Sequence, residues 1–127
     1  FNEPVADAAR SILDGHIVLS RRLANARHFP AVDVLESVSR VRDEVIPRAH
    51  RESADAFLRL EAAYRAHEDL IAVGAYKSGT DPVVDAAIAL RAQTEAFLCQ
   101  APDDAGGLAE TRARLAALQA AAPAGAA

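Results

Sequence analysis

The 127-residue sequence has no tryptophan, no methionine and a single cysteine, Cys99. One cysteine excludes an intrachain disulfide and suits a reducing compartment, and without neighbouring ligands Cys99 suggests neither a nucleophile nor a zinc site. No apolar run approaches the roughly 20 residues that span a bilayer, and no signal-peptide pattern is present. A net charge of −4 without a basic face gives no reason to expect nucleic acid. These absences predict a cytosolic domain.

What the sequence does contain favours helix. Hydrophobic residues make up 51%, many of them alanine, so a core must depend on leucine, isoleucine, valine and the few aromatic rings. The bias towards alanine, leucine, arginine and glutamate is typical of helices. Phe1 is not an initiator methionine, and NEPVAD reads as the middle of a sequence. We therefore expect the C-terminal part of a longer protein.

The first third of the chain predicts a small mixed segment, residues 1–45. Residues 4–14 fit a short helix that begins near a proline, and the β-branched run 16–20 predicts a short buried strand. Ser20 can cap a second helix over residues 21–27, which a proline at position 30 ends. Residues 31–41 are predicted to be irregular, apart from an extended piece at 32–35.

The remainder predicts a three-helix unit, residues 47–121, so the fold class is mainly α. Apolar residues recur at helical spacing from Ala54 to Ile71, and glycines at 74 and 79 mark a loop. Asp81 and Pro82 then give a helix start, and that second helix is expected to continue to Phe97. A break at 102–107 precedes a last helix, and residues 122–127 are expected to be a disordered tail.

Four short motifs occur in order within the first 41 residues: NEPVAD, ILDGHIVLSR, FPAVD and SVSRV. In this order and spacing they resemble the rotary ATPase superfamily, the relatives of the ATP synthase α and β subunits. The DVL after FPAV, together with HEDLIAVGAY and SGTDPVVDAAI, is similar to the flagellar and virulence type III export ATPases. The resemblance covers roughly residues 2–97, and VDVL favours the virulence (injectisome) branch.

This resemblance implies a hexameric ATPase that uses ATP with Mg²⁺ to energise protein export. The segment 1–45 is then the end of a RecA-like nucleotide-binding domain, and 47–121 is the C-terminal helical domain. In the family, the arginine of SxSRV reaches the γ-phosphate bound by a neighbouring subunit, and here that is Arg40. A planar, permanently charged guanidinium can follow the charge that spreads over a transferring phosphoryl group. The alternative is a structural or surface arginine.

Two aromatic residues are implied to touch the nucleotide. Phe29 corresponds to the ring that stacks on adenine in the same subunit, because a purine face needs a flat apolar partner. Tyr76, in GAYKSG, lies in a loop that would approach the adenine. The alternatives are a core phenylalanine and a loop aromatic that packs under the helical domain, and Lys77 in the same loop reads as solvated.

The phosphate-binding motif GxxxxGK[ST] is absent. The resemblance places that loop, the Walker B acid, the catalytic glutamate and the Mg²⁺ ligands upstream of Phe1. We expect the isolated 127 residues not to hydrolyse ATP, and no residue is assigned as a metal ligand. His16 beside Asp14 is interpreted as a satisfied core histidine rather than an acid–base pair.

The resemblance also implies partners and a location. They are neighbouring subunits of a homohexamer, a central coiled-coil stalk protein and export chaperone–substrate complexes, at the cytoplasmic face of the inner membrane, peripheral to the export gate. A second interpretation is an isolated helical module, residues 47–121, that binds the stalk protein or chaperone–substrate complexes without catalysis. A third is an unrelated helical adaptor in which the motifs are coincidental.

Overall fold

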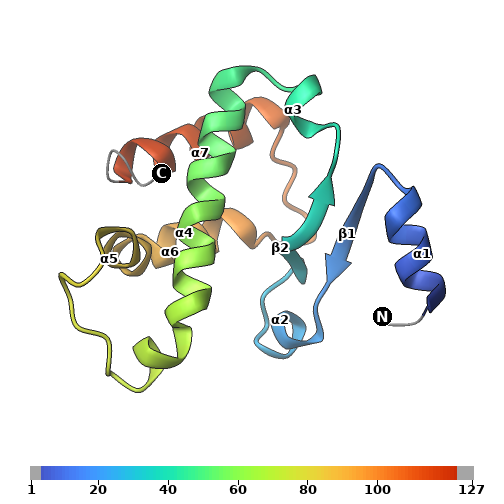
Figure 1. Ribbon diagram of the computed structural model, residues 1–127. Coiled ribbons are helices and arrows are strands. Elements are labelled where there is room, and N and C mark those ends of the chain that lie inside the picture. Colours follow the sequence, from blue (N-terminus) through green and yellow to red (C-terminus); the bar gives the residue numbers. More distant parts are fainter. Residues whose placement is uncertain (1–3, 123–127) are drawn as a thin grey trace. The chain divides into compact units, whose positions relative to one another are not determined.

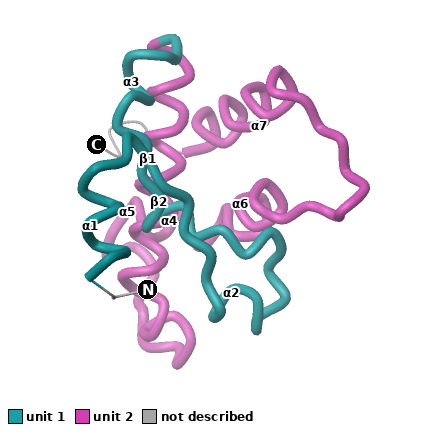
Figure 2. The backbone as a smooth tube through the Cα atoms, turned by 90° about the vertical axis from the view of Figure 1, so that its right-hand side faces the viewer, with its two compact units in different colours: residues 1–47 teal, residues 48–127 magenta. Residues whose placement is uncertain are grey.

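The chain divides into two compact units in a computed structural model that describes residues 4–122 (Figures 1 and 2). Unit 1 comprises Phe1–Pro47 and unit 2 comprises Arg48–Ala127. The tail predicted for residues 122–127 lies, apart from Ala122, outside the described residues.

Among its described residues, unit 1 contains three short helices and an antiparallel strand pair. Its elements are α1 (Pro4–Ile12), β1 (Gly15–Leu19), α2 (Arg21–Asn25), β2 (Val32–Ser39) and α3 (Arg42–Val45). The prediction of an irregular segment at 31–41 was wrong, because eight residues of it form β2. A local irregularity in β2 breaks the two-residue alternation from which strands are recognised. Helix α3 was also not predicted.

Two further predictions for unit 1 need correction. The strand at 16–20 exists as β1, but it is not buried: Ile17 is 75% exposed and Leu19 is 71% exposed. Over residues 4–47 the sheet has only two strands, too few to cover both faces of β1. Helix α2 is capped by Ser20 as expected, yet it ends at Asn25, well before the proline. Arg27 has a φ of 61°, a left-handed conformation that cannot continue a helix.

The regular elements of unit 2, among its described residues, are all helices. Its elements are α4 (Arg48–Ala72), α5 (Pro82–Ala89), α6 (Arg91–Leu98) and α7 (Leu108–Ala121). Helices α5 and α7 pack against α4, and α6 contacts both α5 and α7 (Figure 1). The expected single helix from 83 to 97 is therefore two helices. The chain turns at Leu90, where φ is −96° and ψ is 5°.

The core of unit 2 lies where α4 meets α5. Leu60, Ala87 and Leu90 are buried together there, and the ring of Tyr64 packs against them. Phe57 of α4 meets Phe97 of α6 with ring centroids 5.1 Å apart, a tilted arrangement favourable to aromatic pairs. The turn at Leu90 therefore follows from packing, since it points this leucine into the core.

The start of α5 is as the sequence predicts. Asp81 is the N-cap, and its carboxylate accepts a hydrogen bond of 2.9 Å from the Val83 N–H. Gly74 and Gly79 have φ values of 73° and 91°, which glycine adopts without strain. Among the described residues, no helix is both long and apolar enough to span a membrane.

Candidate functional site

Arg40 is the first residue after β2, and it is tied to α1. Its backbone N–H donates to the Asp14 carbonyl at 2.7 Å. Its guanidinium donates to the carbonyls of Arg10 at 2.9 Å and Ser11 at 3.3 Å. These carbonyls are near the C-terminal end of α1, where unpaired carbonyl groups favour a cation. Arg40 is nevertheless exposed, so its guanidinium is held in place while it remains accessible to solvent.

A bulge in β2 precedes Arg40. In the ladder, Leu19 and Val18 of β1 face Val32 and Asp33, and further along His16 faces Val38. One residue of β1 therefore stands opposite four residues of β2, 34–37. A bulge of this size changes both the register and the direction of the strand that follows it.

Side chains at the two ends of the bulge hold it closed. The Asp33 carboxylate oxygen Oδ1 accepts hydrogen bonds from the N–H groups of Leu35 at 3.1 Å and Glu36 at 3.2 Å. The Ser37 hydroxyl donates to the Asp33 carbonyl at 2.7 Å and accepts from the Val18 N–H at 3.0 Å. Asp33 is buried, with 7% of its surface exposed. Sequence reasoning missed both residues, although aspartate and serine side chains that bond nearby backbone groups are a turn signal.

Phe29 lies just before β2 and is 47% exposed, so a large part of its ring is free to contact a ligand. Phe29 precedes one end of the strand pair, and Arg40 follows the other end. The carbonyl of Asp14 accepts from Arg40, and the N–H of Ser20 donates to Ala31. Six steps of extended chain from Asp14 to Ser20 cover about 20 Å. Arg40 and the Phe29 end of β2 are therefore separated by about the length of β1.

Tyr76 organises the loop between α4 and α5. Its hydroxyl donates to Asp85 Oδ1 at 2.8 Å and to the Asp81 carbonyl at 3.2 Å. The other carboxylate oxygen of Asp85 accepts from the Gly79 N–H at 2.9 Å, so one carboxylate connects two points of the loop. Partial burial and the hydrogen bond to Asp85 raise the pKa of the Tyr76 phenol. The ring stands edge-on to His67, with centroids 6.1 Å apart.

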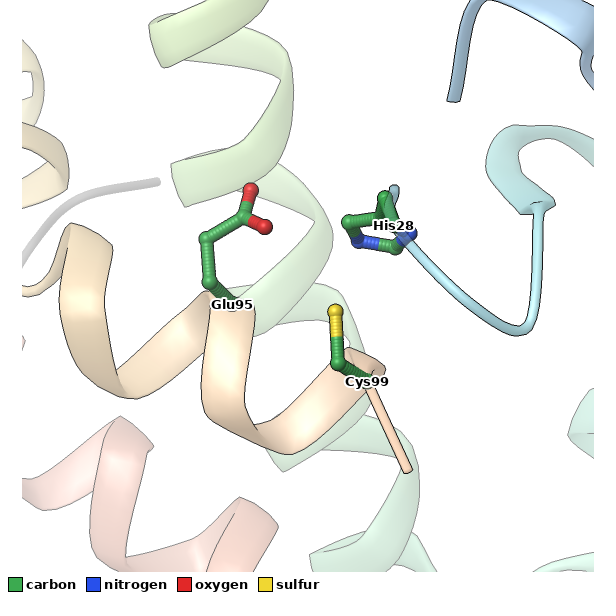
Figure 3. A group of neighbouring side chains, drawn as sticks. All are labelled: His28, Glu95 and Cys99. Atoms are coloured by element: carbon green, nitrogen blue, oxygen red, sulfur yellow. The ribbon is translucent and has the colours of Figure 1, made fainter. Parts of the chain in front are cut away.

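Figure 3 shows His28, Glu95 and Cys99, whose side chains are of metal-binding types. His28 belongs to unit 1, whereas Glu95 and Cys99 lie on and directly after α6 in unit 2. Glu95 already pairs with Arg91 within α6. The three residues therefore belong to two different units and carry no assignment as a metal site.

Family models match almost the whole chain. The model described as the T3SS EscN ATPase C-terminal domain matches residues 46–117. The model described as the nucleotide-binding domain of the ATP synthase alpha/beta family matches residues 1–39. These two matches exclude the interpretation as an unrelated helical adaptor.

Curated relatives come from both branches of the family. The flagellum-specific ATP synthase of Pseudomonas aeruginosa is 50% identical over 116 residues, 91% of this chain and 26% of that protein. The type 3 secretion system ATPase of Sinorhizobium fredii is 50% identical over 109 residues, 86% of this chain and 24% of that protein. The chain thus spans about a quarter of these relatives. Because both branches match at the same identity, the preference for the virulence branch stays a prediction.

Solved structures agree with this assignment and with the mainly α fold. The assembled ATPase EscN from the enteropathogenic E. coli type III secretion system has a TM-score of 0.88 at 41% identity, covering 93% of this chain and 29% of that one. EscN in complex with its central stalk EscO has a TM-score of 0.86 at 40% identity, covering 92% and 29%. The chain therefore belongs to the type III secretion and flagellar export ATPase family, within the ATP synthase α/β superfamily.

Proposed function

We propose that this chain is the C-terminal part of a hexameric, cytoplasmic ATPase that energises type III protein export. In this proposal Arg40 acts on ATP bound by the neighbouring subunit, and Phe29 stacks on the adenine bound by its own subunit. The observation that carries it is that Arg40 and the end of β2 that follows Phe29 are separated by about the length of β1, about 20 Å. Two contacts so far apart are suited to two different nucleotides.

The environment of Arg40 supports the trans role. An arginine that stabilises a transferring phosphoryl group must be accessible and must also be held in a fixed direction. Arg40 is exposed, and its side chain is oriented by the Arg10 and Ser11 carbonyls. Carbonyl groups are neutral, so the guanidinium keeps its net positive charge, whereas a carboxylate partner would neutralise it.

Phe29 and Tyr76 fit nucleotide contacts in different ways. The half-exposed ring of Phe29 provides the flat apolar surface that a purine needs. The hydroxyl of Tyr76 is engaged by Asp85, so its ring is the part left for a ligand. Phe29→Ala should then raise the KM for ATP about 2- to 12-fold, the loss of one stacking interaction. Tyr76→Ala should raise it as well, and Tyr76→Phe should not.

ATP would bind with Mg²⁺, which neutralises phosphate charge during transfer. The phosphate-binding loop and the Mg²⁺ ligands are proposed to belong to the remainder of the longer protein. The 127 residues alone are accordingly expected to show no ATP turnover.

The direct test replaces Arg40 in the longer protein. Arg40→Ala should lower kcat by about 10³-fold or more, since arginine fingers contribute on that scale in other nucleotidases. Arg40→Lys should recover only part of this rate, because lysine keeps the charge but not the two-pronged geometry. Arg48→Ala is the matched control, since Arg48 makes an exposed ion pair with Glu52 in α4. Near-normal turnover of intact Arg40→Ala hexamers would show the assignment to be wrong.

A second function is favoured by the structural likeness to EscN in complex with its central stalk EscO. Helices α6 and α7 enclose a surface hollow of about 270 Å³, lined in part by Ala96, Phe97 and Leu118. Such a hollow suits an amphipathic helix, so unit 2 is proposed to bind the stalk protein or export chaperone–substrate complexes near the membrane export gate. A pull-down with residues 47–121 tests this. Retention of neither partner would leave unit 2 with a scaffold role only.

A further inference from the structure

We propose that Asp33 and Ser37 are positioning residues for Arg40, because they hold closed the β2 bulge, residues 34–37, that sets where this arginine emerges. The inference rests on the proposed function of Arg40. Neither residue is proposed to touch nucleotide. Their role is to fix the register of β2 against β1, and with it the face of the sheet on which the Arg40 side chain lies.

The register shows why the bulge matters. One residue of β1, Ile17, stands opposite four residues of β2, so β2 carries three extra residues. If the bulge opened into regular strand, Arg40 would move about 10 Å along β1. Because three is an odd number, the same slip would also turn the Arg40 side chain to the other face of the sheet. An arginine displaced in this way could not reach the phosphate of a neighbouring subunit.

The hydrogen bonds show what holds the bulge closed. Within the ladder the Val18 N–H would normally donate to a backbone carbonyl, but here it donates to the Ser37 hydroxyl. That hydroxyl donates in turn to the Asp33 carbonyl, which ties one end of the bulge to the other. Asp33 Oδ1 secures the middle through two backbone N–H groups. Removing the Ser37 hydroxyl therefore leaves a strand N–H without its acceptor and frees the bulge to open.

At the other end of the ladder, Gly15 supports the same geometry. A Cβ at this position would lie 2.7 Å from the Val38 carbonyl oxygen, closer than real Cβ contacts allow. The strands therefore approach each other closely just before Arg40. The bulge and this close approach together fix where β2 ends and Arg40 begins.

The test compares serine variants in the longer ATPase. Ser37→Ala should lower kcat about 10- to 100-fold, as expected when a catalytic group is misplaced by an ångström or more. The KM for ATP should change less than about 3-fold, because Arg40 is proposed to act in the transition state. Ser37→Thr keeps the hydroxyl and suits a strand, so it should recover most of the rate. Asp33→Ala should resemble Ser37→Ala, whereas Asp33→Asn keeps a carbonyl acceptor and should lose less.

Ser53→Ala is the matched control, because this buried hydroxyl bonds to Ala49 and Gln119 in unit 2. It should leave kcat unchanged even if the melting temperature falls. The decisive comparison is Ser37→Ala in an Arg40→Ala background. If Ser37 acts through Arg40, the double variant should have the same kcat as Arg40→Ala alone.

Three results would count against the inference, and they distinguish its failure from the failure of the proposed function. If Arg40→Ala lowers kcat but Ser37→Ala does not, or if the two losses multiply, the positioning role is wrong and the proposed function stands. If Arg40→Ala itself leaves kcat near wild type, the proposed function fails and this inference fails with it.

Discussion

Arg91 is predicted to stabilise unit 2 through three contacts at once. It donates to the Glu61 carboxylate at 3.2 Å, pairs with Glu95 one turn along α6, and lies over the ring of Tyr64 at 4.1 Å from the centroid. The Glu61 side chain is only 8% exposed, whereas that of Arg91 is 31% exposed. Arg91→Ala would therefore leave a buried carboxylate without this cation and remove a cation–π contact.

The magnitude follows from that burial. Removing one partner of a buried ion pair costs about 3–5 kcal/mol, and the partial exposure of Arg91 lowers our expectation to about 2–3 kcal/mol. For a unit of this size, that corresponds to a fall of about 10–20 °C in melting temperature. The exposed pair of Arg48 with Glu52 has side chains 82% and 51% exposed, so Arg48→Ala should cost less than about 1 kcal/mol.

Circular dichroism at a helical wavelength is the suitable assay, since the chain has no tryptophan. A double variant separates the loss of the ion pair from the loss of side-chain volume. Glu61→Leu combined with Arg91→Met should melt higher than Arg91→Met alone, because no buried charge is left without a partner. Equal melting temperatures for Arg91→Ala and Arg48→Ala, within a few degrees, would refute this reasoning.

Three further predictions concern the loop, the strands and a helix start. The raised pKa of Tyr76 means that the native state keeps the phenol proton to higher pH than the unfolded state. Stability should fall as pH rises above 10, and Tyr76→Phe should remove this dependence in melting curves between pH 9 and 12. Gly15→Ala forces a Cβ against Val38, so hydrogen exchange at the Arg40 N–H should accelerate. Asp81→Ala removes the α5 N-cap and should cost about 1 kcal/mol, measured by denaturant unfolding.

The parts of the fold that could be predicted depend on neighbours in sequence. The start of α5 was predictable because Asp81 and Pro82 act within one turn of their own positions. The turn at Leu90 was not, since no glycine or proline marks it and its cause is burial against α4. The Arg91–Glu95 pair has helical spacing, but its third member, Glu61, is 30 residues away and becomes a neighbour only in the folded unit.

The candidate site shows the same division. Arg40 and Phe29 were found because the motifs resemble a known family, and charge or aromatic character alone would not have selected them. The bulge between them was missed, because residues 34–37 of β2 stand opposite a single residue of β1 and interrupt the alternation of the strand. Its signal was present in the side chains of Asp33 and Ser37, which compete with the strand ladder for backbone hydrogen bonds.

Arg40 is proposed to complete the site of a neighbouring subunit, and mixed hexamers provide the clearest test. One subunit type carries Arg40→Ala, and the other carries a replaced lysine in the proposed phosphate-binding loop of the longer protein. Each hexamer alone should be inactive. In mixtures, a subunit with an intact loop next to one with an intact Arg40 forms a complete site, so ATP turnover should reappear. Turnover that stays absent at every mixing ratio, in hexamers shown to contain both subunits, would show that Arg40 does not act on the neighbouring subunit's nucleotide.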